Sequence, residues 1–267
     1  MRTPSRNIRA KLEAGDRVFG TTVQVPSPEI VEIVGYTGFD FVWLDAEHGT
    51  MDLGDIACLI RSAEASGIDS IVRVPNADPS FIQRVLDAGA TGILAPHVRS
   101  ASDATALVSA SKFPPMGIRG ACPATRAVGH YTDDWIEDYQ RADRDTIAWA
   151  LVEDPEGVDD IERIVRTPGL DGIVVGPFDL AQSLGFEGDV FHPEIVEMHA
   201  RVVKAVEGSD VELVSLTGYE PGGMAAVIER DARIVCAGSD RSAIALGFRR
   251  ALRSLTDGLR APVQEQR

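Results

Sequence analysis

The chain has 267 residues, of which 44% are hydrophobic, enough for one large domain or two small ones. Its formal net charge of −15 disfavours nucleic acid and anionic membrane surfaces as partners. No apolar run approaches the roughly 20 residues of a membrane helix, and the N-terminus lacks the apolar core of a secretory signal. We therefore predict a cytoplasmic protein.

The three cysteines, Cys58, Cys122 and Cys236, are far apart in the sequence and odd in number. This pattern excludes a disulfide framework and a paired-cysteine metal site. We expect Cys58 and Cys236 to be buried as small apolar residues.

Short apolar runs alternate along the chain with segments of helical periodicity. The predicted strands are 18–25, 39–45, 69–75, 91–98, 147–153, 170–176, 211–217 and 233–238. Most are nearly continuous apolar runs, which are typical of parallel strands buried on both faces. Between them, apolar residues recur at i, i+3, i+4 and i+7, as in 52–67 and 192–208.

Eight such units predict an α/β fold, a (β/α)8 TIM barrel that forms one domain over residues 1–260 and begins with an N-terminal helix. Residues 261–267 are expected to be a disordered tail. A doubly wound open sheet is the alternative, but the even spacing and the missing GxGxxG motif argue against it. The long segment 113–146 exceeds an ordinary loop, so we expect it to be functional or an oligomer contact.

The working residues of such a barrel lie at the carboxyl ends of its strands. The polar residues at or just after the ends of predicted strands are Asp45, Glu47, His48, Arg73, His97, Glu153, Asp154, Asp179, Ser239 and Asp240. Each follows an apolar run, so a buried carboxylate among them needs a partner.

Glu153 and Asp179 are the candidate metal pair, because Mg²⁺ and Mn²⁺ take carboxylate oxygens as ligands. Salt bridges are the alternative for both residues. His48, beside two carboxylates, is the candidate acid/base. Arg73 could hold a substrate carboxylate or an enolate, and an ion pair with Asp45 is a compatible alternative.

The three lysines of the chain, Lys11, Lys112 and Lys204, all fall on predicted helices and none follows a strand. A Schiff-base mechanism requires a desolvated amine in the barrel mouth. Any carbonyl chemistry is therefore expected to use a metal.

Six segments of the sequence together resemble one enzyme family. They are FDFVWLDAEHG, VRVP, GATGILAPHV, PPMGIRG, LVED and DGIVVGPFDL. In this order and spacing they resemble the class II, metal-dependent 2-keto acid aldolases of the HpcH/HpaI family, over about residues 7 to 255. The resemblance implies cleavage or formation of 4-hydroxy-2-keto acids from an aldehyde and pyruvate, or a close 2-keto acid such as hydroxypyruvate, through a metal-stabilised enolate.

The resemblance also implies roles for individual residues. Glu153 and Asp179 match the metal carboxylates, with Mg²⁺, Mn²⁺ or Co²⁺ as the ion. His48 matches the acid/base histidine, and Arg73 the arginine that steadies the keto and enolate oxygen. Asp87 matches an aspartate that raises the basicity of the histidine. Asp45 is expected to brace Arg73 or the turn, and Glu47 to reach only metal-bound water.

For substrate binding, the resemblance implies the backbone around Phe178 and Asp179 as the carboxylate site, with Gly176 and Leu151 beside it. Leu151 stands where many relatives carry a glutamine. His97 stands where other side chains are common, and its role stays open, as do those of Arg119 and Arg126.

The resemblance also implies a homo-oligomer, a trimer or hexamer whose C-terminal helix is exchanged between subunits. The same helix would equally cover its own barrel. Two other functions stay open. One is a carbon–carbon lyase for acyl-CoA esters, which the acidic chain disfavours. The other is a non-catalytic 2-keto acid sensor, which would not require the base.

Overall fold

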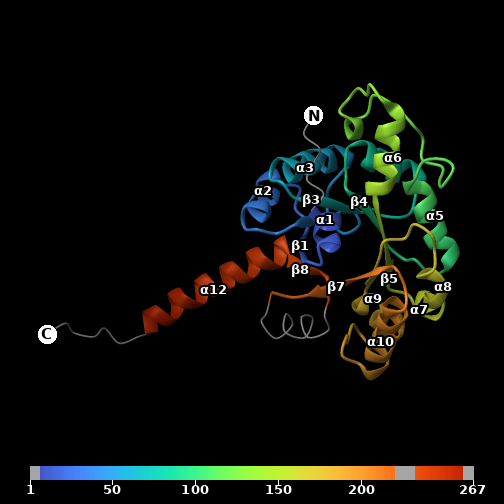
Figure 1. Ribbon diagram of the computed structural model, residues 1–267. Helices are drawn as coiled ribbons and strands as arrows, with labels where there is room; N and C mark the ends of the chain where they lie inside the picture. Colours follow the sequence, from blue (N-terminus) through green and yellow to red (C-terminus); the bar gives the residue numbers. More distant parts are fainter. Residues whose placement is uncertain (1–6, 220–231, 261–267) are drawn as a thin grey trace.

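The computed structural model describes residues 7–219 and 232–260 (Figure 1). Eight parallel strands close into a barrel in sequence order, with β8 pairing with β1. The strands are β1 Val18–Val23, β2 Phe41–Asp45, β3 Asp69–Arg73, β4 Gly92–Ala95, β5 Ile147–Val152, β6 Gly172–Val175, β7 Glu212–Thr217 and β8 Ile234–Ser239. Each overlaps a predicted strand, so the TIM barrel is confirmed and the doubly wound sheet is wrong.

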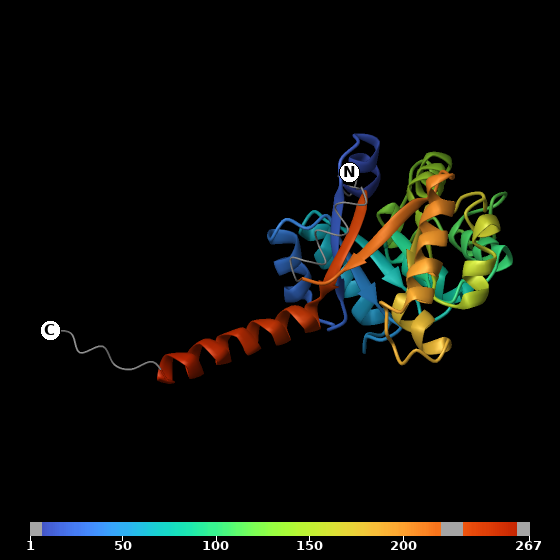
Figure 2. The same ribbon diagram turned by 90° about the horizontal axis from the view of Figure 1, so that it is seen from below.

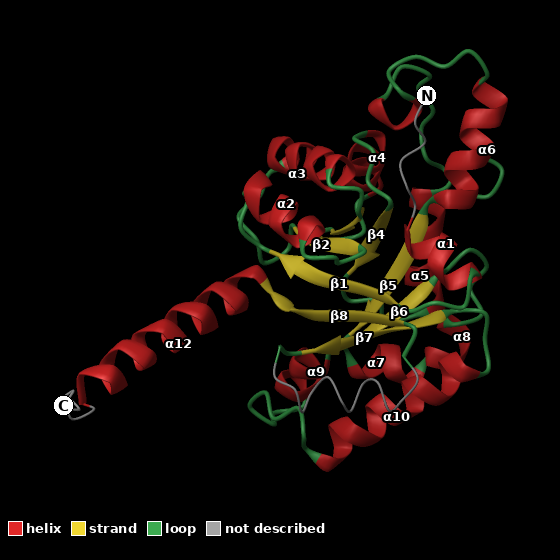
Figure 3. Cartoon of the chain, turned by 60° about the vertical axis from the view of Figure 1, so that its left-hand side comes forward, coloured by secondary structure: helices red, strands yellow, loops and turns green. Residues whose placement is uncertain are grey.

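Helices follow the strands around the outside of the barrel (Figure 3). They are α1 Asn7–Glu13, α2 Pro28–Tyr36, α3 Leu53–Ala65, α4 Pro79–Asp87, α5 Ala101–Ser111, the 3₁₀ helix η1 Arg126–Val128, α6 Trp135–Asp145, α7 Pro155–Asp159, α8 Ile161–Ile164, α9 Pro177–Ser183, α10 Pro193–Glu207 and α12 Asp240–Arg260. The helices predicted within 52–67 and 192–208 are α3 and α10. The helix expected after β7 would fall on 220–231, outside the described residues, as does the predicted tail.

Apolar side chains form one layer between sheet and helices and a second inside the barrel. Within the barrel, the rings of Phe41 and Trp149 meet edge to face with centroids 5.6 Å apart. Helix α1 adds the buried Ile8 to this interior cluster, and the backbone N–H of Ile8 donates to Asp69 at the start of β3. Because α1 covers the amino ends of the strands, the carboxyl ends are left for a site.

The long segment before β5 forms η1 and α6 and packs near the ends of α3 and α4. Arg119 Nη2 lies 2.8 Å from Asp87 Oδ1, and Arg126 contacts Glu64 and donates to the carbonyl of Ala88 at 3.0 Å. These contacts fix the segment at the amino end of the barrel. Whether it forms an oligomer contact stays a prediction.

Helix α12 leaves the barrel and extends away from it (Figures 1 and 2). Its apolar residues Ile244, Phe248, Leu252 and Leu255 recur along one stripe and are 43–74% exposed. The alternative in which this helix covers its own barrel is therefore wrong. Among the described residues, no helix combines the length and apolar character needed to cross a membrane. Cys236 is buried as expected, but Cys58 is exposed on α3, so that prediction is wrong.

Candidate active site

The carboxyl ends of β2, β3 and β5 aim polar side chains into the barrel mouth. Trp43, Ile71 and Leu151 belong to the interior cluster. Side chains alternate along a strand, so the residues two positions later, Asp45, Arg73 and Glu153, point to the same side. The sequence thus places two carboxylates and a guanidinium above the core.

Asp45 and Arg73 form a bidentate ion pair on neighbouring strands. Arg73 Nε and Nη2 lie 2.9 and 2.7 Å from the two oxygens of the fully buried Asp45. Burial alone raises the pKa of Asp45, but the hydrogen bonds and charge of Arg73 outweigh it, so the pKa is lowered. The guanidinium also lies 5.2 Å from the centroid of the Trp43 ring, within cation–π range. The predicted ion pair is confirmed.

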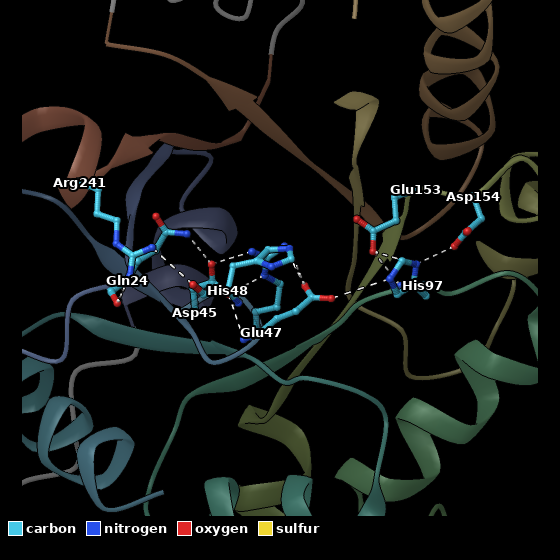
Figure 4. Close-up of polar contacts among 9 residues, drawn as sticks. Gln24, Asp45, Glu47, His48, His97, Glu153, Asp154 and Arg241 are labelled. Carbon is cyan, nitrogen blue, oxygen red and sulfur yellow. Dashed lines mark hydrogen bonds and ion pairs between the residues drawn. The ribbon is translucent and has the colours of Figure 1, made fainter. Parts of the chain in front are cut away.

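The turn after β2 carries Glu47 and His48, whose backbone N–H groups both donate to Asp45 Oδ1 at 3.2 Å. The turn requires Gly49, because a Cβ there would lie 2.0 Å from the Asp45 carbonyl oxygen. Glu47 Oε2 lies 3.0 Å from Arg73 Nη1 and 3.8 Å from His48 Nε2. The His48 side chain lies beside Glu47 (Figure 4) and is 61% exposed, so its imidazole is accessible to solvent.

A second group of polar side chains lies across the mouth (Figure 4). The backbone N–H of His97 donates to Glu153 Oε1 at 3.0 Å. His97 Nδ1 lies 2.9 Å from Asp154 Oδ2, and Nε2 lies 3.9 Å from Glu47 Oε1. Arg99 Nη2 contacts the other oxygen of Asp154 at 3.1 Å.

The residues of this group fit a divalent cation. One potential ligand atom from each of Glu47, His97 and Glu153 lies within 4.8 Å of the others. Burial raises the pKa of Glu153 to about 7, opposed by His97 and increased further by the charges of Asp179 and Glu47. Closely spaced carboxylates that resist ionisation together are stabilised by a metal ion, and hard cations prefer oxygen donors.

Of the predicted metal pair, Glu153 therefore belongs to this donor cluster. Asp179 lies outside the cluster, exposed in the first turn of α9, but its charge acts on Glu153. Glu47 and His97 were not predicted as ligands. The available signal was their position directly after β2 and β4.

The predicted substrate residues lie at the ends of β5 and β6. Gly176 is required there, because a Cβ would lie 2.6 Å from the Glu153 Cβ. Leu151 is buried two residues before Glu153, whereas Phe178 is 60% exposed. Leu151 and Gly176 thus form the wall beside Glu153.

Asp87 lies at the opposite end of the barrel. It ends α4, which returns the chain to the amino end of β4, and it pairs with the buried Arg119. The structure therefore does not bring Asp87 to His48 of its own chain. Its effect on the histidine stays a prediction.

Two further residues brace the His48 turn. Gln24, which follows β1, donates to Asp45 Oδ2 at 2.9 Å. Arg241, in the first turn of α12, lies 3.4 Å from the carbonyl oxygens of His48 and Gln24. Sequence reasoning missed both residues, although each lies just beyond the end of a strand.

The lysines are not at the mouth. Lys11 on α1 pairs with Asp40 before β2, and the buried Lys112 donates to the carbonyl of Thr146 before β5. Lys204 lies on α10. The expectation of no amine at the strand ends is confirmed.

The sequence model of the HpcH/HpaI aldolase/citrate lyase family matches residues 20–245. A hydroxypyruvate/pyruvate aldolase of Paraburkholderia phytofirmans is 33% identical over 218 residues, covering 79% of this chain and 83% of that protein. A 5-keto-4-deoxy-D-glucarate aldolase of Klebsiella pneumoniae is 31% identical over 261 residues, covering 95% of this chain and 96% of that protein.

The fold comparison agrees with these matches. The crystal structure of an HpcH/HpaI aldolase from Desulfitobacterium hafniense superposes with a TM-score of 0.89 at 29% identity, covering 97% of this chain and 99% of that one. The family matched is one of metal-dependent carbon–carbon lyases, as the resemblance implied. The chain belongs to the HpcH/HpaI aldolase/citrate lyase family.

Proposed function

We propose that this protein is a metal-dependent class II aldolase that cleaves or forms 4-hydroxy-2-keto acids. The observation that supports this most is the donor cluster of Glu47, His97 and Glu153 beside the Arg73–Asp45 pair. The retro-aldol products would be an aldehyde and pyruvate or hydroxypyruvate, in keeping with the names of the relatives.

Glu153 and Asp179 would hold the ion, with Mg²⁺, Mn²⁺ or Co²⁺ as candidates. Glu153 is fixed by the His97 N–H and by close packing against Gly176. When bound, the ion supplies Lewis acidity that polarises a carbonyl oxygen.

His48 is proposed as the acid/base. In the cleavage direction its imidazole accepts the proton of the C4 hydroxyl, the C3–C4 bond breaks and the aldehyde is released. The electron pair of that bond passes into the enolate of the 2-keto acid, and a proton returned to C3 completes the reaction. The exposed ring and the backbone contacts of its turn with Asp45 suit this role.

Arg73 is proposed to steady the enolate oxygen. Asp45 fixes the guanidinium through two hydrogen bonds, and further N–H groups of Arg73 remain for a substrate oxygen. The positive charge is therefore pre-oriented before substrate binds.

The substrate would lie against the wall formed by Leu151 and Gly176. We propose that the backbone N–H groups at Phe178 and Asp179, at the start of α9, hold the keto-acid carboxylate. The exposed Phe178 ring would then lie at the substrate side of the mouth.

The protein is also proposed to form a homo-oligomer, a trimer or hexamer, in which α12 packs on a neighbouring copy. The exposed apolar stripe from Ile244 to Leu255 supports this, because an isolated helix gains little stability from its own residues. Asp87 could act on His48 only from a neighbouring copy. Light scattering on the intact chain should give a trimer or hexamer, and Phe248→Glu should shift it to smaller species.

The function is tested with a panel of 4-hydroxy-2-keto acids by measuring pyruvate or hydroxypyruvate release with Mn²⁺, with Mg²⁺ and after chelation. We expect activity that chelation abolishes and either metal restores. Cleavage that survives exhaustive chelation would exclude the metal mechanism, and a borohydride-trapped pyruvate adduct would indicate a lysine. Turnover of acyl-CoA esters alone, or pyruvate binding without turnover, would favour the lyase or sensor alternative instead.

A further inference from the structure

We propose that His97 contributes an imidazole nitrogen ligand to the metal ion at the barrel mouth. This ligand would shift the preference of the site from Mg²⁺ toward Mn²⁺, Co²⁺ and Zn²⁺. The proposal rests on the proposed metal-dependent function but concerns a residue beyond the carboxylate pair Glu153 and Asp179.

The hydrogen bonds of His97 orient its ring for ligation. Asp154 Oδ2 lies 2.9 Å from Nδ1, and Arg99 Nη2 holds the other oxygen of Asp154 at 3.1 Å. With Nδ1–H donating to the carboxylate, the lone pair of Nε2 is free. A carboxylate that fixes the second nitrogen of an imidazole is the usual arrangement around metal-binding histidines.

Both nitrogens of the His97 ring lie close to carboxylates of the donor cluster. Nε2 lies 3.9 Å from Glu47 Oε1 and Nδ1 lies 3.5 Å from Glu153 Oε1, and one ligand atom of each of Glu47, His97 and Glu153 lies within 4.8 Å of the others. The His97 side chain is 48% exposed, so an ion can reach it from the mouth.

The backbone of His97 also supports a functional role. Its φ of +52° lies in the left-handed region, which residues other than glycine adopt uncommonly and asparagine, aspartate and histidine adopt most often among them. In this conformation its N–H donates to Glu153 Oε1 at 3.0 Å. One residue therefore holds a carboxylate ligand through its backbone N–H and offers an imidazole ligand through its side chain.

The chemistry of the added ligand predicts the change in metal preference. Mg²⁺ prefers oxygen ligands and retains its water, whereas imidazole suits the first-row transition ions, with affinity increasing from Mn²⁺ to Zn²⁺. A site with carboxylates alone would favour these ions over Mg²⁺ less strongly.

The direct test is pulsed EPR of the intact protein loaded with Mn²⁺, prepared with natural and with ¹⁵N-labelled histidine. We expect a histidine nitrogen coupling that changes with the isotope, persists in labelled His48→Gln and disappears in His97→Phe. If His97→Phe does not fold, the labelled wild-type and His48→Gln samples still show whether a histidine other than His48 binds Mn²⁺.

Competition titrations provide the second measurement. His97→Phe should lower the ratio of Zn²⁺ to Mg²⁺ affinity at least about tenfold, and Asp154→Asn, which keeps the imidazole, should weaken Zn²⁺ binding about tenfold. Bound Mn²⁺ without histidine coupling, or coupling that survives His97→Phe, would overturn this proposal alone. Failure of Mn²⁺ to bind would overturn the proposed function as well.

Discussion

The two halves of the barrel mouth each hold a buried carboxylate, but in opposite electrostatic states. In the Arg73 half, formed by Gln24, Asp45, Arg73 and Arg241, the buried carboxylate is matched by a bidentate guanidinium. In the His97 half, formed by Glu47, His97, Glu153 and Asp154, the carboxylates outnumber the fixed cations, and the pKa of Glu153 is raised to about 7 by burial above all.

This electrostatic difference indicates which buried carboxylate supports the fold and which one requires an ion. A paired buried carboxylate is already stabilised by its partner, so it has little to gain from a metal. A buried carboxylate surrounded by others binds a cation or a proton instead. The two halves therefore make different predictions about which substitutions affect metal binding and which affect folding.

The largest effect is expected for Glu153→Gln in the His97 half. Loss of this oxygen ligand should weaken Mn²⁺ binding at least about 100-fold and lower kcat/KM roughly 1,000-fold, since metal stabilisation of developing charge amounts to several kcal/mol. Titration calorimetry and the cleavage assay measure both. Glu162→Gln, an exposed acid paired with Arg166, is the matched control and should change neither. Unchanged Mn²⁺ affinity in Glu153→Gln would contradict the ligand assignment.

His48, between the two halves, should separate catalysis from metal binding. His48→Ala is expected to lower kcat roughly 10²- to 10⁴-fold, because it removes the general base, while Mn²⁺ affinity stays within about threefold. Steady-state kinetics and calorimetry on the same preparation check this. Normal cleavage by the alanine variant would show that another group accepts the C4 hydroxyl proton.

In the Arg73 half, the main consequence should be for stability. Asp45→Asn removes the bidentate charge partner of Arg73 in a buried site and leaves only the contact with Glu47, so the free energy of unfolding should fall by about 3 kcal/mol. Urea denaturation of metal-free protein measures the change, and Glu162→Gln, at an exposed pair, should cost under about 0.5 kcal/mol. A loss no larger than in the control would mean that the pair adds nothing to folding.

The smallest effect concerns the pH dependence of metal-free protein. The pKa of Glu153 is raised from 4.5 to about 7, so between these values the folded state keeps a proton that the unfolded chain releases. Stability should therefore fall by about 1–3 kcal/mol as pH rises across this window and then level off. Glu153→Gln should lack this decrease in the free energy of unfolding with pH. If the stabilities of the wild type and of Glu153→Gln changed in parallel from pH 5 to 8, this prediction would be contradicted.

The fold could be predicted from the sequence because most β-strands are buried, largely apolar runs and the β–α unit repeats along the chain. The site could be predicted in part, since strand ends converge in a barrel and Asp45, Arg73 and Glu153 continue the inward alternation. The contacts of His97 with Asp154 and Glu47 depend on a left-handed backbone and on residues from three loops, which no local pattern encodes. Asp87 was expected to act on His48, but the fold places it at the opposite end of the barrel.

The contrast between the two halves is tested most directly by anomalous diffraction from a crystal soaked with Mn²⁺ and pyruvate. We predict one strong manganese peak within bonding distance of Glu153, in the His97 half, and none beside the Asp45–Arg73 pair. A peak that contacts Asp45 and not Glu153, or no peak at the mouth, would contradict the account.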